Sequence, residues 1–241
     1  MIYCYFSCSK DERLLAASIA SLRAVEPEAV VYVANDENDR ASVPDGCHEV
    51  LTRYQRGSTG MGLPAVEGEL LTMQHILKEE KTAYVVKIDS DMWVNDTTAL
   101  QVLGKGDTEP DFLGYETASM LQPSGGVYRL SKWAVDYALS ETQQRWQKKL
   151  WNPAATYSEN FTIFRLVCLA TTLHAHLIPY GSHRLVGMHD DGFNNNRRAH
   201  LAEFVHCGEP LDGATRVARE HVFTRMALLR SEAALMEKEK K

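Results

Sequence analysis

Short apolar runs and helical stripes alternate along the first half of the chain. Five runs have the length of β-strands: Ile2 to Phe6, Ala29 to Ala34, Ala83 to Ile88, Asp111 to Tyr115 and Val127 to Leu130. A helical stripe from Leu14 to Leu22 follows the first run, and a second stripe, from Leu70 to Leu77, leads into the third. Strands that alternate with helices predict an α/β fold with a mainly parallel central sheet flanked by helices.

The second half of the chain continues with helical patterns and one long polar stretch. Two further helices are expected over Trp133 to Leu139 and Phe161 to Leu173, the first of them after Ser131, a plausible N-cap. The stretch Gly181 to His200 is rich in Gly, Asn, His and Arg and is too long for an ordinary connection, so we expect a substrate loop there.

A helical pattern also occupies the end of the sequence, from Ala214 into a Lys/Glu tail. We expect one domain over residues 1–213 and a C-terminal helical extension over residues 214–241. The apolar face of that extension could pack on the core or on a partner, as in a homodimer.

Composition and charge narrow the classes of function. A net charge of -6 on 241 residues gives no footprint for a polyanion, so we expect no nucleic-acid partner; the nearest basic pair is Arg53 with Arg56. The five cysteines are odd in number and contain no CxxC pair, which predicts neither a disulfide framework nor a zinc site. No apolar run is long enough to span a bilayer and no leader pattern opens the chain, so we expect a cytoplasmic protein.

Asp89 and Asp91 carry the strongest chemical signal, because they directly follow an apolar strand in the segment YVVKIDSDMWV, residues 84–94. Ligands of open α/β sheets bind outside the carboxyl ends of the strands. Two neighbouring carboxylates repel each other unless a cation neutralises them, and Mg²⁺ and Mn²⁺ prefer oxygen ligands shared with phosphates. The pattern favours a divalent metal site, although D-x-D also occurs by chance in turns where Asp only hydrogen-bonds the backbone.

The D-x-D after such a strand resembles that of GT-A-fold glycosyltransferases. The resemblance implies a GT-A-like fold and the transfer of a sugar from a nucleotide-sugar donor, expected to be a UDP-sugar, to a hydroxyl-bearing acceptor such as a glycan or glycoconjugate. Bound Mn²⁺ or Mg²⁺ would stabilise the charge that develops on the leaving diphosphate. Asp89 and Asp91 would hold that cation.

The resemblance also implies a third metal ligand late in the chain. The segment Phe204 to Gly208 is similar to a late strand followed by histidine in many such transferases, which assigns His206 to this role. A histidine hydrogen-bonded to a backbone carbonyl is the plainer alternative, and His183 or His189 could be the ligand instead.

Residues near the ends of three expected strands match donor-binding segments of the family. Gly125 and Gly126 resemble the place where the backbone approaches the donor sugar, although a tight turn before a strand would use the same residues. Asp36 matches the acid that hydrogen-bonds the nucleotide, and a polar turn is its alternative. Ser7 and Ser9 would line the same nucleotide pocket.

Acceptor and catalytic roles fall on acids later in the chain. Glu159 matches the base of inverting members at a helix N-terminus, but Asn160 stands where a second acid is often found, which leaves the stereochemical course open. A first-turn Glu is also favoured by the helix dipole alone. Asp190 and Asp191 lie in the long polar stretch, which suits either the hydroxyls of an acceptor or a solvated loop.

Two other functions remain compatible with these patterns. A phosphatase of the haloacid-dehalogenase type also uses D-x-D after a strand, but on its first strand and with a small or β-branched residue where this chain has Trp93. A non-catalytic relative that binds a nucleotide or glycan would share the same residues, because a fold does not guarantee activity.

Overall fold

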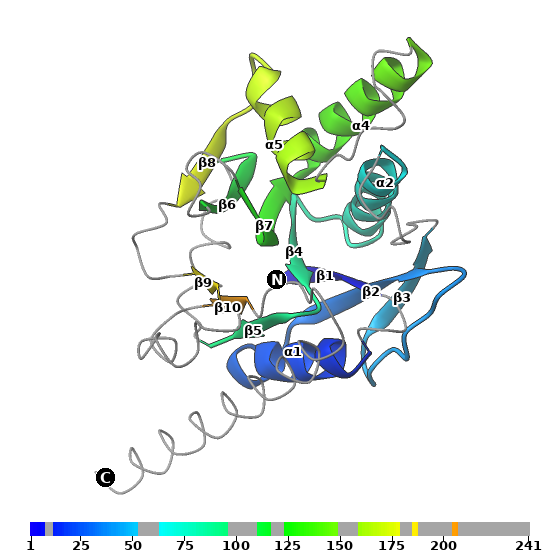
Figure 1. Cartoon of the computed structure of the whole chain (residues 1–241), viewed down its shortest axis with the longest axis vertical. Coiled ribbons are helices and arrows are strands. Elements are labelled where there is room, and N and C mark those ends of the chain that lie inside the picture. The colour runs from blue at the N-terminus through cyan, green and yellow to red at the C-terminus, as the bar shows by residue number, and fades with distance from the viewer. Residues whose placement is uncertain are drawn as a thin grey trace, which may run out of the picture.

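The protein is represented by a computed structural model that describes residues 1–7, 12–52, 63–95, 110–116, 123–148, 159–178, 185–187 and 204–206 (Figure 1). In chain order the elements are β1 (Ile2–Ser7), α1 (Glu12–Val25), β2 (Val30–Asp36), β3 (His48–Thr52), α2 (Leu63–Glu79), β4 (Tyr84–Asp89), β5 (Met92–Val94), β6 (Phe112–Glu116), β7 (Pro123–Ser131), α4 (Lys132–Gln147), α5 (Glu159–Leu169), β8 (Ala175–Ile178), β9 (Leu185–Gly187) and β10 (Phe204–His206).

Within the described ranges, seven strands form the central sheet, in the order β3-β2-β1-β4-β7-β6-β8. Every neighbouring pair is parallel except the two pairs that involve β7, which runs antiparallel to β4 and β6. A second, three-stranded sheet has the order β5-β10-β9. The expected α/β fold with a mainly parallel central sheet is therefore confirmed.

Helices cover both faces of the central sheet. One apolar cluster combines α2, α4 and α5 with the sheet residues Cys4 and Phe6, and the other combines α1 with Tyr3 and Tyr5, so alternate residues of β1 enter opposite layers. Figure 1 shows α2, α4 and α5 together on one side of the sheet and α1 on the other. Burial on both faces explains why β1 reads as a continuous apolar run in the sequence.

Ser131 connects the start of α4 to the sheet, as its N-cap pattern predicts. Its hydroxyl oxygen accepts a hydrogen bond from the Ala134 N–H at 3.0 Å, and the hydroxyl donates to Asp111 Oδ1 at 2.5 Å. The other oxygen of Asp111 accepts the His174 N–H at 3.0 Å. One carboxylate thereby joins the ends of β6, β7 and the loop before β8 at the amino edge of the sheet.

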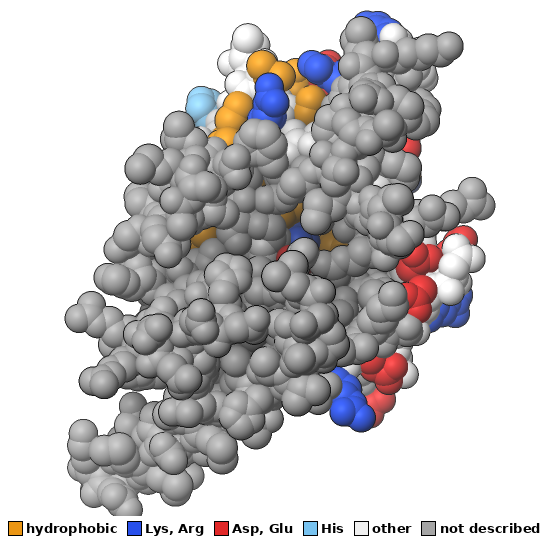
Figure 2. All heavy atoms as spheres, in the orientation of Figure 1, with side chains coloured by type: hydrophobic (Ala, Val, Ile, Leu, Met, Phe, Trp, Pro, Cys, Tyr) orange, Lys and Arg blue, Asp and Glu red, His pale blue; other side chains and the backbone are white. Residues whose placement is uncertain are grey.

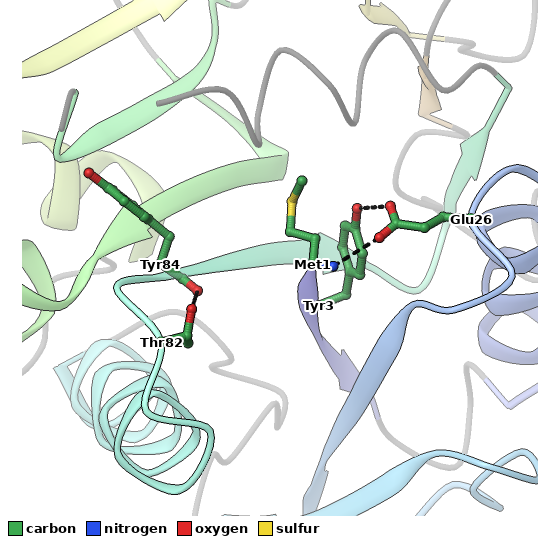
Figure 3. A network of polar contacts seen from close by, with 5 residues as sticks. All are labelled: Met1, Tyr3, Glu26, Thr82 and Tyr84. Carbon is green, nitrogen blue, oxygen red and sulfur yellow. Dashed lines mark hydrogen bonds and ion pairs between the residues drawn. The ribbon is translucent and has the colours of Figure 1, made fainter. Parts of the chain in front are cut away.

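The amino end of β1 is tied to the segment after α1. The Met1 ammonium lies 3.0 Å from Glu26 Oε1, and the Tyr3 hydroxyl donates to Glu26 Oε2 at 2.6 Å (Figure 3). Burial and this carboxylate raise the pKa of Tyr3 well above its usual value. These contacts fix the amino edge of the sheet, opposite the edge where β4 ends at Asp89.

Several elements differ from the sequence expectations. The strands β3, β5, β8 and β9 were not expected: β3 is an edge strand with exposed His48 and Glu49, and β5 and β9 have three residues each, too few for a visible alternation. The helix expected over Phe161 to Leu173 ends at Leu169. Part of the expected loop Gly181 to His200 is the strand β9.

The C-terminal end of the chain is not among the described residues. The expected C-terminal extension, residues 214–241, lies outside the described residues, and so does any dimer contact it makes. No helix in the described ranges is long and apolar enough to cross a membrane.

On the face drawn in Figure 2, acidic side chains gather on the flank where β2 and β3 lie; Glu37, Asp45 and Glu49 are exposed residues of this region.

Candidate functional site

Four strands bring their expected site residues to one edge of the central sheet. Asp89, the last residue of β4, is in register with Phe6 of β1, so the next residue, Ser7, lies just beyond Asp89 at the carboxyl edge. Ser7 in turn is in register with Asn35, the residue before Asp36 at the end of β2. Parallel pairing alone thus places Ser7, Asp36 and Asp89 along the same edge.

The glycine pair reaches this edge from the opposite direction. Because β7 is antiparallel to β4, its beginning meets the end of β4: Val127 pairs with Ile88, and Gly126 is the next residue toward Asp89. Gly125 and Gly126 lie inside the strand β7, so the alternative of a tight turn before a strand is wrong for these two residues. Gly126 has no side chain but is itself buried, so a close approach of a donor beside Asp89 stays a prediction.

Asp89 and Asp91 flank a turn between β4 and β5. The side chain of Asp89 is 15% exposed, and Asp91 is 5% exposed. Ser90 between them is buried as well. Two carboxylates are therefore held at the rim of the sheet with little surface open to solvent.

Helix α1 holds β5 in place through two buried serines. The Ser18 hydroxyl donates to the Met92 carbonyl oxygen, and the Val94 N–H donates to Ser21 Oγ at 2.9 Å. The Ser21 hydroxyl also donates to the Ser18 carbonyl oxygen at 2.7 Å, which links the two contacts. Because β5 begins directly after Asp91, these serines also fix the position of the acid pair.

The other side of β5 pairs with β10, which carries His206. In this antiparallel pairing His206 is in register with Met92, the residue that follows Asp91. Two segments more than a hundred residues apart in the sequence are thus brought side by side next to the acid pair. The side chain of His206 lies outside the described residues, so its assignment as a metal ligand stays a prediction.

Lys87 is the charged residue of this site that the sequence analysis missed. Its ammonium lies 2.5 Å from Asp89 Oδ1, and its side chain is only 2% exposed. The available signal was a lysine within an apolar strand, two residues before Asp89 and therefore on the same face of β4. The positive charge of Lys87 already reduces the repulsion between Asp89 and Asp91 without a metal. Repulsion between the two acids is therefore not by itself a reason to expect a cation here.

Asp36 forms the polar turn that was weighed as its alternative role. Its Oδ1 accepts the Asn38 N–H at 2.8 Å, and its carbonyl oxygen accepts the Asp39 N–H at 3.3 Å. Asn35 closes the same loop through its side-chain amide, which donates to the Ala41 carbonyl oxygen at 3.0 Å. A nucleotide contact of Asp36 stays a prediction beside this structural role.

Glu159 is the first residue of α5, and the direction of the chain places it toward the carboxyl edge. The segment after α5 returns to the amino edge, where the His174 carbonyl oxygen accepts the Phe112 N–H at 3.1 Å. A helix of 11 residues spans about 16 Å, so its first turn lies toward the opposite edge. The side chain of Glu159 is outside the described residues, and so are Ser9, His183, His189, Asp190 and Asp191.

A separate pocket of about 640 Å³ opens between the edge strand β3 and helix α2. Its lining contains neither Asp89 nor Asp91; it consists of residues 49–52 together with Glu67, Gly68, Leu71, Thr72 and His75. Thr52 pairs with Asp36, so one end of this pocket lies beside the end of β2.

The donor atoms at the rim suit a hard divalent cation. Asp89 and Asp91 offer carboxylate oxygens, which Mg²⁺ and Mn²⁺ prefer over nitrogen or sulfur. Among the described side chains, no group of three or more His, Cys, Asp or Glu residues gathers around one point. Two protein carboxylates plus substrate phosphates are nevertheless a usual set for Mg²⁺.

Three solved structures that share this fold are those of glycosyltransferases. A glycosyltransferase involved in the glycosylation of the major capsid of PBCV-1 aligns over 93% of this chain and 98% of its own, with a TM-score of 0.57 and 13% identity. The galactosyltransferase LgtC, in complex with donor and acceptor sugar analogs, aligns over 94% of this chain and 95% of its own, with a TM-score of 0.55 and 14% identity. An active-site mutant of LgtC gives a TM-score of 0.56 at 12% identity over 94% of this chain and 95% of that one.

Sequence comparison adds no relative. No family model matches the chain, and no curated protein sequence matches it. At such low identity, the structural likeness establishes the GT-A-like fold that the D-x-D segment led us to expect.

Proposed function

We propose that this GT-A-like chain is a metal-dependent glycosyltransferase that moves a sugar from a nucleoside diphosphate sugar, expected to be a UDP-sugar, to a hydroxyl acceptor. The observation that carries the proposal is the position of Asp89 and Asp91 at the carboxyl edge of the sheet, where Asp89 is in register with Phe6 near the end of β1. Ligands of open α/β sheets bind at this edge. The fold shared with glycosyltransferases supports the same conclusion.

Asp89 and Asp91 would hold Mn²⁺ or Mg²⁺, with His206 as a third ligand. When bound, the cation supplies Lewis-acid stabilisation of the diphosphate leaving group. With no side chain, Gly126 would allow the donor to approach Asp89 closely, and Ser7 would contact the nucleotide at the end of β1. The burial of Asp91 and Ser90 keeps water away from this rim, which strengthens electrostatic interactions there.

Glu159 is the candidate for the base that takes the proton of the acceptor hydroxyl. Its support is the direction of α5, whose first turn lies toward the carboxyl edge. The cytoplasm is the compartment that we propose, because the cysteine pattern favours a reducing environment.

The direct test is release of nucleoside diphosphate from a panel of nucleotide sugars, with Mn²⁺ or with excess chelator. We expect activity to require the cation, and Asp91→Asn to lower the rate by about a hundredfold or more, because charge stabilisation in the transition state would be lost. Asp39→Asn is the matched control: Asp39 is half-buried in the loop after β2, and its replacement should leave the rate unchanged.

The outcomes separate the alternatives. Equal transfer in excess chelator would contradict a metal-dependent mechanism. A rise in melting temperature with Mn²⁺ and UDP, without turnover on any donor, would indicate a binding protein, because a ligand of the native state stabilises it by mass action. Release of phosphate from simple phosphoesters would indicate a phosphatase.

A further inference from the structure

We propose that Lys87 is a positioning residue for the cation site: it holds Asp89 through one carboxylate oxygen and so presents the other oxygen to the metal. This inference rests on the proposed function, because it assigns Asp89 to a divalent cation. It adds a residue that supports the acid pair from inside the core.

The contact between Lys87 and Asp89 is short and shielded from solvent. The ammonium lies 2.5 Å from Asp89 Oδ1, and the lysine side chain is 2% exposed. A side chain buried to this degree is shielded from a substrate, and among the described carboxylates at the rim Lys87 contacts Asp89, so we infer that it acts on the site through Asp89. The Asp89 side chain is 15% exposed, more than that of Lys87, so it is the part of the pair that reaches the surface at the rim.

The surroundings of Lys87 restrict where its ammonium can lie. Cys4, Lys87 and Tyr128 occupy one row across β1, β4 and β7, and all three are buried. The ammonium lies 5.3 Å from the centre of the Tyr128 ring, a distance at which a cation is attracted to the ring face. Lysine has a flexible stem, so this packing is what confines it to one position.

Tyr128 connects this row to helix α2. Its hydroxyl donates to Glu69, a fully buried residue of α2. Burial and the nearby carboxylate of Glu69 raise the pKa of the Cys4 thiol, and the ammonium of Lys87 opposes this increase. The charges of Glu69 and Lys87 therefore both lie close to Cys4. A chain of contacts therefore runs from α2 through Tyr128 and Lys87 to Asp89 at the rim.

A positioning role and a simple charge effect predict opposite changes in metal affinity. Removing a positive charge beside a cation site should tighten cation binding, because a repulsive interaction is lost. Removing a residue that orients a metal ligand instead weakens binding, typically by about 10-fold to 100-fold. The sign of the change therefore distinguishes the two roles.

The experiment measures Mn²⁺ affinity of the full chain from the paramagnetic resonance signal of free Mn²⁺, with and without UDP. We expect Lys87→Met, which has a similar volume and no charge, to weaken Mn²⁺ binding by about 10-fold or more. The matched control is Lys132→Met, the same substitution at an exposed lysine of α4; its Mn²⁺ affinity should stay close to that of the native protein.

A double-mutant cycle separates positioning from general damage to the fold. In an Asp89→Asn background, Lys87→Met should cause no further loss of Mn²⁺ affinity, because its effect is transmitted through Asp89. If Lys87 had only a structural role, the losses of Mn²⁺ affinity caused by Lys87→Met and by Asp89→Asn would add. If Lys87→Met does not fold, Lys87→Gln is the second variant; its shorter chain should also weaken binding.

The inference is overturned if Lys87→Met binds Mn²⁺ as tightly as the native protein or more tightly. The same result for Lys87→Gln, used in its place, has the same meaning. Losses of Mn²⁺ affinity that add in the double-mutant cycle would also overturn it. Native Mn²⁺ binding in the same series would leave the proposed function standing. Failure of the native protein to bind Mn²⁺ would instead remove the metal-dependent function, and the inference with it.

Discussion

Ser21 offers a sharp test of how the core fixes the acid pair. Its Oγ accepts the buried Val94 N–H of β5 at 2.9 Å, and its hydroxyl donates to the Ser18 carbonyl oxygen at 2.7 Å. Ser21→Ala deletes both contacts and adds no bulk. The β5 backbone then loses its hydrogen-bond acceptor on α1, two residues beyond the start of the strand.

The size of the effect follows from burial. Ser21 is 1% exposed, so water has no easy access to replace the lost acceptor. Removing one partner of a buried donor costs about 1–3 kcal/mol. For a domain of this size, each kcal/mol lowers the melting temperature by about 2–4 °C, so we expect a decrease of roughly 2–12 °C.

Ser18→Ala provides an internal comparison. The Ser18 hydroxyl donates to the Met92 carbonyl oxygen, which has two lone pairs, whereas the Val94 N–H has a single hydrogen to donate. We therefore expect Ser21→Ala to destabilise the protein more than Ser18→Ala.

Urea unfolding and thermal melting would measure these differences, with Ser140→Ala on the exposed side of α4 as the control. An exposed substitution of this kind changes stability by less than about 0.5 kcal/mol. Equal unfolding midpoints for Ser21→Ala and Ser140→Ala would refute the reasoning that α1 anchors β5 through Ser21. Nucleotide affinity in Mn²⁺ should also fall in Ser21→Ala, since β5 follows Asp91.

Two further predictions concern the core. Cys4 is fully buried and burial raises its thiol pKa, so at pH 8 a thiol reagent should leave it unmodified in the native protein and label it only after unfolding; peptide mapping should find the exposed Cys168 labelled before Cys47 and Cys4. Gly114→Ala should cost about 1–3 kcal/mol in urea unfolding, because the new methyl group would lie 2.9 Å from the Phe112 ring; an unchanged midpoint would show that the ring can move away.

The buried strands were predictable because both of their faces meet helices. Runs such as Ile2 to Phe6 are apolar throughout, and the structure places Tyr3 and Tyr5 in one layer and Cys4 and Phe6 in the other. Edge strands lack this signal: in β3, His48, Glu49 and Leu51 are exposed, so the segment reads as a polar connection. The three-residue strands β5, β9 and β10 are too short for any periodicity.

The sequence by itself determined that an apolar strand ends at Asp89 and that Asp91 follows two residues later, because residues that are neighbours in the chain can be read directly from the sequence. It also determined the α/β class, through the alternation of strand and helix patterns. The order of the strands was not accessible, because pairing depends on contacts between segments far apart in the chain. Only the fold decided that Gly126 lies beside Asp89 and that His206 is in register with Met92.

The role of Lys87 likewise became visible only in three dimensions. In the sequence, a lysine within this strand is also compatible with a solvent-facing residue of an edge strand. In the structure, α2 and β7 bury Lys87, and a buried charge requires a partner of opposite charge. Local sequence records which groups are present, and tertiary packing decides which of them lose water. That loss of solvent makes a single lysine, ring and carboxylate act together at the edge of the sheet.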